Sequence, residues 1–188
     1  MKTLIVKYIP RNEQSNTKKL LDAFREEISI SDVEELDLLD DVPDMLLDNN
    51  LLAYINRNFL GQELLPEEEM PLSKMDRMAA QLKSADIVVV AFPMYNFSMP
   101  AIVKAWFDSV IQKGDALSLS NLEFQYMGYS DVRGILAEGM SMNEEVNQTN
   151  LNKSIRQVRA IAKEWYKKEE CDSMCVNLIS KKRRFDNV

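Results

Sequence analysis

The sequence predicts an α/β domain built on a doubly wound parallel sheet with helices on both faces. Apolar, β-branched runs alternate along the chain with segments whose apolar residues recur at helical spacing. The 188 residues, 46% of them hydrophobic, suffice for one sizeable core and leave little room for a second. We therefore expect one domain at residues 1–170, followed by a C-terminal extension at residues 171–188.

The first strand-helix-strand unit is predicted near the N-terminus. Residues 3–8 are apolar and β-branched, as in a buried strand. Residues 20–28 carry apolar side chains at helical spacing, with Ser15 or Asn16 as the candidate N-cap. A shorter second strand is expected at residues 33–38.

The middle of the chain predicts two helices before its clearest strand and one helix after it. A helix is expected to run through Leu60, and residues 61–71, with two prolines, are expected to form an exposed connection. Ser73 opens an amphipathic helix. Residues 87–92, Ile-Val-Val-Val-Ala-Phe, are apolar throughout, as a central parallel strand is. The helix at residues 101–114 ends at a glycine.

The last third departs from the alternation of strands and helices. Residues 116–127 have a helical pattern, so two helices would follow each other across Gly114 and Asp115. A strand is expected at residues 132–137, and a capping box at residues 141–144 opens a long helix. Because crossovers alternate with parallel strands, one central strand is apparently missing. Either the sheet has four strands, or the synthesised chain holds an extra segment between Gly114 and Asp115 and exceeds 21.7 kDa, which we favour.

Composition excludes several classes of protein chemistry. The chain has no histidine, which removes His-dependent catalytic triads, imidazole bases and His-ligated metals. None of the spacings among its five glycines gives a Rossmann or Walker phosphate loop. Cys171 and Cys175 have the wrong spacing for a redox or zinc pair, so we expect reduced thiols without a function and no metal site.

Charge and hydropathy constrain the partners and the compartment. With 23 basic and 30 acidic residues the net charge is −7, which opposes binding to nucleic acid. The one basic run, residues 181–184, is interpreted as a solvated tail rather than a nucleic-acid hook. No apolar run is long enough for a membrane span, and the N-terminus turns polar too soon for a signal peptide, so a cytoplasmic protein is expected.

Ligands of open α/β sheets bind beyond the carboxyl ends of the strands, and the first such loop is polar. Residues 9–17 lead into a helix N-terminus, whose free N–H groups attract phosphate. Ser15 and Thr17 offer hydroxyl donors, Asn16 an amide donor and Arg11 a guanidinium. This pattern predicts a phosphate site without glycine; the alternative is a helix cap beside an exposed arginine.

The loop after residues 87–92 has the opposite character. It places aromatic rings, thioethers and prolines where loops are usually polar, which a flat apolar ligand would explain. The alternative is that these side chains belong to a core or a subunit interface. The candidate ligand-binding residues of this loop are Pro93, Met94, Tyr95, Asn96 and Phe97.

Residues 91–101, Ala-Phe-Pro-Met-Tyr-Asn-Phe-Ser-Met-Pro-Ala, followed by Lys-Ala-Trp-Phe-Asp at residues 104–108, make a specific motif. It resembles the flavin-binding signature of the FMN-dependent NADH:quinone oxidoreductases and azoreductases, a flavodoxin-like group. Residues 14–17 resemble the phosphate-binding loop of that group, and residues 137–140 resemble it before the last helix. The similarity extends from Met1 to about Lys168.

The resemblance implies a flavodoxin-like, FMN-binding domain. Residues 15–17 would hold the FMN phosphate and residues 94–97 would line the isoalloxazine ring, whereas Arg11 is added from its charge alone. The segment missing at residues 114–115 would carry a strand and a loop that also contacts the flavin. Since the cofactor carries the chemistry, no catalytic side chain is assigned.

The implied activity is transfer of hydride from NADH or NADPH through FMN to a quinone or azo acceptor. The alternatives are a non-enzymatic flavodoxin-like electron carrier and a flavin-binding scaffold. The resemblance also implies a homodimer. Trp106 and Phe107 are adjacent on a predicted helix and point about 100° apart, so one of them is expected to reach beyond the core of its own subunit.

Overall fold

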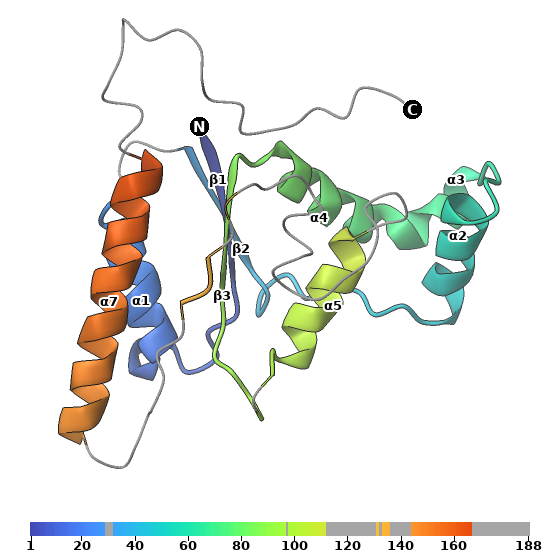
Figure 1. The fold of residues 1–188 in the computed structure, drawn as a ribbon. Coiled ribbons are helices and arrows are strands. Elements are labelled where there is room, and N and C mark those ends of the chain that lie inside the picture. The colour runs from blue at the N-terminus through green and yellow to red at the C-terminus, as the bar shows by residue number, and fades with distance from the viewer. Residues whose placement is uncertain (29–31, 97, 112–130, 132, 136–143, 167–188) are drawn as a thin grey trace, which may run out of the picture.

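The fold is a layered α/β arrangement with one helical projection (Figure 1). The computed structural model describes residues 1–28, 32–96, 98–111, 131, 133–135 and 144–166. Its elements, in chain order, are β1 (Lys2–Lys7), η1 (Asn12–Gln14), α1 (Asn16–Arg25), β2 (Asp32–Asp37), α2 (Asp48–Asn58), α3 (Pro66–Glu69), η2 (Met70–Leu72), α4 (Ser73–Ser84), β3 (Ile87–Ala91), α5 (Ala101–Val110) and α7 (Glu144–Tyr166).

Three parallel strands form the described sheet, in the order β2-β1-β3. Side chains of β1 alternate between the two faces, because successive residues of a strand point to opposite sides. Leu4 and Val6 enter the core cluster on one face, and Ile5 enters the cluster on the other. The predicted parallel, doubly wound arrangement is confirmed for this part of the chain.

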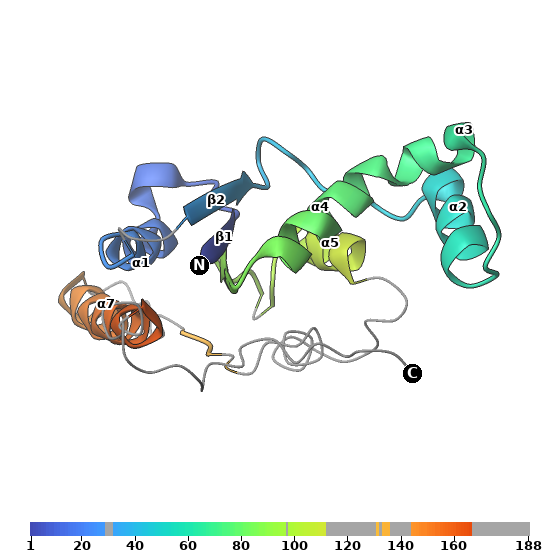
Figure 2. The ribbon, with the colours of Figure 1, turned by 90° about the horizontal axis from the view of Figure 1, so that it is seen from above.

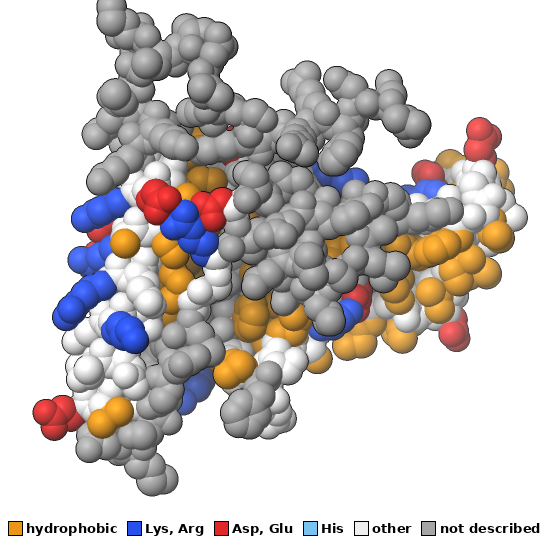
Figure 3. Space-filling model, viewed as in Figure 1, with side chains coloured by type: hydrophobic (Ala, Val, Ile, Leu, Met, Phe, Trp, Pro, Cys, Tyr) orange, Lys and Arg blue, Asp and Glu red, His pale blue; other side chains and the backbone are white. Residues whose placement is uncertain are grey.

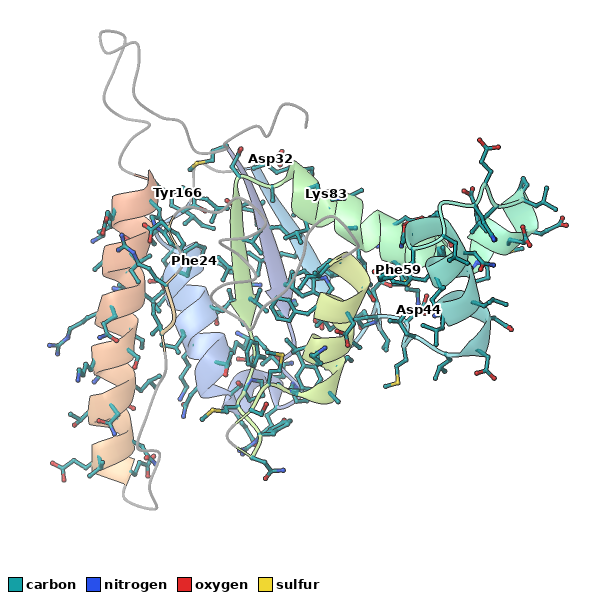
Figure 4. All side chains as sticks on the ribbon, turned by 45° about the vertical axis from the view of Figure 1, so that its right-hand side comes forward. Phe24, Asp32, Asp44, Phe59, Lys83 and Tyr166 are labelled. Atoms are coloured by element: carbon teal, nitrogen blue, oxygen red, sulfur yellow. The ribbon has the colours of Figure 1, made fainter. Side chains whose placement is uncertain are left out.

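Helices cover both faces of the sheet, as predicted. Figure 1 shows α1 and α7 on one side of the strands and α4 and α5 on the other, and Figure 2 shows the same layers from above. Phe24 of α1 packs edge-on against Tyr166 of α7, with ring centroids 6.1 Å apart (Figure 4). The Tyr166 hydroxyl also shares a buried 2.6 Å hydrogen bond with the Thr3 hydroxyl, which fixes α7 to β1.

The expectation that Trp106 or Phe107 reaches beyond the core of its own subunit is wrong. Both side chains are buried in the cluster between the sheet and the helices α4 and α5. Their rings pack against each other at 4.9 Å. Because residues of α5 share this cluster with residues of both β1 and α4, two directions about 100° apart both face the core.

The segment predicted as an exposed connection, residues 61–71, is largely exposed, as expected, but it contains helical turns. Pro66 occupies the first turn of α3, where its missing N–H costs no hydrogen bond. The Glu68 carboxylate accepts the Leu65 N–H at 2.9 Å and caps the turn. Leu72 then anchors the segment in a small core with Ala53.

Expectations for the last third are confirmed only at the long helix, which α7 matches. Residues 133–135, inside the predicted strand 132–137, belong to no strand. The Arg133 side chain is instead held by Asp131 and Glu164. Four other expectations lie outside the described residues. They are the missing strand at the junction 114–115, the helical pattern at 116–127, the capping-box residues 141–143 and the C-terminal extension at 171–188. No helix within the described ranges has the length and apolarity that a bilayer crossing requires.

Candidate functional site

The loop after β1 ends in a helix cap supplied by Ser15. Its hydroxyl oxygen accepts the Lys18 backbone N–H at 3.4 Å, and its backbone is extended, as an N-cap residue requires. Ser15 is buried, while Thr17 is half-buried. The choice left open between Ser15 and Asn16 as the cap is therefore settled for Ser15, and Asn16 is the first helical residue.

The first turn of α1 can bind an anion. The helix has ten residues, and its N-terminal N–H groups and dipole favour negative charge. A serine hydroxyl that accepts one hydrogen bond still has its own hydrogen to donate. Ser15 and Thr17 thus add hydroxyl donors at the same end of the helix. This donor set fits a phosphate group.

Lys18 and Arg11 differ in whether a carboxylate of the described residues already pairs with their charge. Lys18 forms salt bridges with Asp22 at 2.8 Å and with Glu13 at 3.4 Å. The hydrogen bond with Asp22 raises the pKa of Lys18, so its charge is already paired. Arg11 is exposed and forms no salt bridge within the described part of the chain; its guanidinium makes a long contact of 3.5 Å with Gln14.

The loop after β3 presents apolar side chains to solvent. Met94 is 46% exposed and Tyr95 is 43% exposed, whereas Pro93 is half-buried. The alternative that Met94 and Tyr95 fold into a core of this chain is therefore wrong. Phe97 lies outside the described residues.

A tight turn fixes the shape of this second loop. The backbone groups of Tyr95 and Ser98 exchange two hydrogen bonds of 2.9 Å. Asn96 between them has a φ of 50°, a left-handed conformation that asparagine tolerates better than most residues. Asn12, in the loop after β1, has a φ of 44°. These are the positive-φ residues other than glycine in the described ranges, and such conformations concentrate at functional sites.

Tyr8 brings the two loops together. Its ring meets the Tyr95 ring edge to face, with centroids 6.4 Å apart and planes at 87°. Its N–H also donates to the carbonyl oxygen of Ala91, at the end of β3, at 2.9 Å. Sequence reasoning missed Tyr8, although an aromatic residue at the carboxyl end of a strand next to a polar loop was a usable signal.

The site therefore combines anion donors with exposed aromatic and thioether groups at one edge of the sheet. Asn16 and Thr17 lie on the anion side, and Met94, Tyr95 and Asn96 on the apolar side. A flat ring that bears a phosphate group matches both halves. Among the described residues, no three acidic or cysteine side chains gather closely enough to hold a metal ion.

Comparisons with known proteins agree with this architecture. A family model described as the flavodoxin-like fold matches residues 1–123. The FMN-dependent NADH:quinone oxidoreductase 1 of Bacillus anthracis is 29% identical over 148 residues, 75% of this chain and 63% of that protein. The FMN-dependent NADH:quinone oxidoreductase of Nitratidesulfovibrio vulgaris (strain DP4) is 33% identical over 138 residues, 71% of this chain and 64% of that protein.

A solved structure is similar in fold. The FMN-dependent NADH-azoreductase from Bacillus anthracis str. Ames Ancestor, in complex with FMN, superposes with a TM-score of 0.73 at 20% identity. The match covers 88% of this chain and 99% of that chain. In sequence, by contrast, the chain spans 63% and 64% of the lengths of the two curated relatives above.

Proposed function

Since the chain belongs to the family with the flavodoxin-like fold, we propose that it is an FMN-dependent oxidoreductase that passes electrons from NADH or NADPH to a quinone or azo acceptor. One observation carries the proposal: the Tyr8–Tyr95 contact joins a polar helix N-terminus and an exposed apolar loop at one edge of the sheet. The names of the relatives, which include FMN and NADH, support the choice of cofactor and donor.

The loop after β1 would hold the FMN phosphate. Ser15 and Thr17 would donate hydroxyl hydrogen bonds, and Asn16 would add its side-chain amide. The N-terminus of α1 would stabilise the negative charge. Arg11 would add a longer-range attraction, because its charge is exposed and unpaired by any carboxylate of the described residues.

The loop after β3 would line the flat ring. Met94 and Tyr95 would contact its apolar surface, and Asn96 would offer an amide to ring heteroatoms. Pro93 and Phe97 complete the set that we assign to the ring. When bound, FMN would supply the two-electron redox chemistry of the reaction. The protein would bind and orient the flat reactants, and no side chain is assigned a proton-transfer role.

We further propose a cytoplasmic homodimer, as the resemblance implies. The absence of a bilayer-length helix from the described ranges is compatible with the cytoplasm. Sedimentation at micromolar protein tests the dimer, and a monomer alone would contradict it. With Trp106 buried, the dimer contact must lie elsewhere than on that side chain.

The segment expected between Gly114 and Asp115 bears on this function, since it would add a flavin-contacting loop. Intact mass tests it. A mass above 21.7 kDa, with peptides that map to the junction, would restore the missing strand. A mass of 21.7 kDa would make this chain a four-stranded variant and would favour a scaffold over an enzyme.

The visible spectrum of the purified protein with added FMN, followed by NADH oxidation with and without a quinone, tests the proposal. A yellow protein whose NADH oxidation depends on the quinone is expected. Binding of flavin without quinone-dependent turnover would indicate the electron carrier instead. A protein that stays colourless with added FMN would remove both.

A further inference from the structure

A helical projection between β2 and α4 carries an exposed apolar surface. We define the arm as residues 40–70, which include α2 and α3 and extend beyond α4 (Figure 1). Hydrophobic side chains gather over this region in the space-filling view (Figure 3). The exposed large apolar residues that carry the argument are Met45, Leu47, Leu51, Leu52, Ile55, Leu60, Leu65 and Met70.

The helix α2 has two apolar sides, and only one of them is buried in a core of the described residues. Its inner side buries Ala53 in the cluster that contains Leu72. Leu47, Leu51 and Ile55 recur every fourth residue on another side of the helix and are 37% to 66% exposed. Contiguous apolar surface of this kind on a folded protein marks an interaction site.

The arm is also strongly acidic. Residues 40–70 contain eight acidic residues and one basic residue, a net charge of −7, which equals the net charge of the entire chain. At its base, Asp41 pairs with Arg77 at 2.6 Å. Farther out, Glu63 and Glu67 are exposed and make no salt bridge with any described residue. The natural occupant is therefore apolar and basic.

The same chain contains one segment with these properties. Residues 173–185, Ser-Met-Cys-Val-Asn-Leu-Ile-Ser-Lys-Lys-Arg-Arg-Phe, carry four basic residues and no acidic ones, together with apolar side chains. We propose that this segment, the tail, docks on the arm of its own chain, with residues 181–184 against the acidic side chains. A second arm is a poorer occupant, because two acidic surfaces repel each other.

The tail is long enough to reach the arm. Fifteen residues separate Lys181 from Tyr166, the end of α7. Fully extended they span up to about 50 Å, about three times the ~16 Å radius of gyration expected for a domain of this length. Tethering raises the local concentration of the tail to the millimolar range. Docking of the tail on the arm of its own chain therefore prevails over docking of the tail on a separate molecule at micromolar protein.

Zero-length carbodiimide coupling of the full-length protein tests the proposal. The expected products join Lys181 or Lys182 to Glu63, Glu67 or Glu68 of the same chain, so they appear in the single-chain band after denaturation. Coupling found only in covalent dimers would overturn docking within the chain in favour of a second copy. Coupling spread evenly over exposed carboxylates, or none at the arm, would mean a solvated tail and would also overturn it.

Matched variants supply a second, independent measurement. Glu67→Gln/Glu68→Gln and Glu144→Gln/Glu145→Gln remove the same charge from the arm and from α7. Only the first pair should increase binding of an apolar dye, toward the level of a chain that ends at residue 172. About 1 M NaCl, where the screening length is about 3 Å, should have the same effect as the arm variant. Equal dye binding by the truncated and full-length chains would refute the proposal. Neither measurement involves flavin, so this result is independent of the proposed enzyme activity.

Discussion

The loops after β1 and β3 end at the same edge of the sheet but differ in nearly every physical property. The first is polar and runs into a helix whose cap, Ser15, is buried. The second is fixed by a two-hydrogen-bond turn and leaves Met94 and Tyr95 exposed. A single ligand that satisfies both must have one charged end and one flat, apolar end.

This contrast separates two contributions to affinity that a single binding constant would merge. FMN and riboflavin share the flat ring and differ in the phosphate, so the pair of ligands measures each loop separately. Substitutions in the loop after β1 should affect FMN alone, and those in the loop after β3 should affect both ligands equally.

The largest effect is expected from Ser15→Ala/Thr17→Ala. Each lost hydrogen bond to a charged group costs about 1.5–3 kcal/mol, so FMN affinity should fall by at least a hundredfold, while riboflavin affinity changes little. Flavin fluorescence titration measures both. Ser15 also caps α1, so Ser15→Asn with Thr17→Ala serves as a control that keeps a capping side chain. Equal losses for the two ligands would contradict the assignment.

Tyr95→Ala should weaken the binding of FMN and the binding of riboflavin by the same factor. Stacking of an aromatic side chain on a flat heterocycle is worth about 1–3 kcal/mol, which corresponds to roughly five- to a hundredfold in affinity. Leu52→Ala, an exposed apolar residue of the arm, is the matched control and should leave both constants unchanged. An effect of Tyr95→Ala on FMN alone would break the division between the two loops.

Arg11→Ala should have a smaller, salt-dependent effect on FMN. Because Arg11 is exposed, we expect about 1 kcal/mol or less, a loss of up to fivefold at low ionic strength. The loss should disappear in about 1 M NaCl, where the screening length is about 3 Å. Lys19→Ala, another exposed cation nearby, is the control. A loss that persists in high salt would mean a direct, desolvated contact with phosphate.

The strands and helices whose periodicity is strong could be predicted from the sequence. The apolar run Ile87–Ala91 and the amphipathic helix from Ser73 both match the structure. The helical turns at Pro66 could not, because proline is both a helix breaker and a favoured first residue of a helix. Which role it takes depends on the cap that Glu68 supplies.

The sequence predicts which residue types form the candidate site, but it does not predict which of their side chains are in contact. Topology alone places the polar loop and the aromatic loop at one edge of the sheet. It does not show that Tyr8 and Tyr95 meet, since ring packing depends on the turn at Asn96. The burial of both Trp106 and Phe107 likewise depended on how α5 packs, which no local pattern records.

The contact between the two loops predicts a measurable coupling. Tyr8→Leu removes the edge-to-face ring contact, which is worth about 0.5–1.5 kcal/mol. It should weaken the binding of FMN and of riboflavin a few-fold. In a double-mutant cycle, the same substitution should have no effect on affinity in a Tyr95→Ala background. Tyr54→Leu, which removes a ring from the Tyr54–Phe59 pair on the arm, is the control. Additive effects of the Tyr8 and Tyr95 substitutions would mean that the loops act independently.

The smallest expected effect is on the stability of the fold. It concerns Asp22 of α1, the helix whose N-terminus we assign to the phosphate. Burial raises the pKa of Asp22, but hydrogen bonds from Lys18 and Arg25 outweigh it and lower the pKa below its usual 3.8. A lowered pKa stabilises the fold above pH 3.8, and this stability is lost as the pH falls through the folded-state value. Asp22 is partly exposed, so Asp22→Asn should cost only about 0.3–0.5 kcal/mol near neutral pH. In urea unfolding the difference from the parent protein should shrink as the pH falls below 3.8, and it should vanish in stronger acid, where the carboxyl is protonated in both the folded and the unfolded state. A cost that persists in acid would mean that Asp22 acts through packing rather than charge.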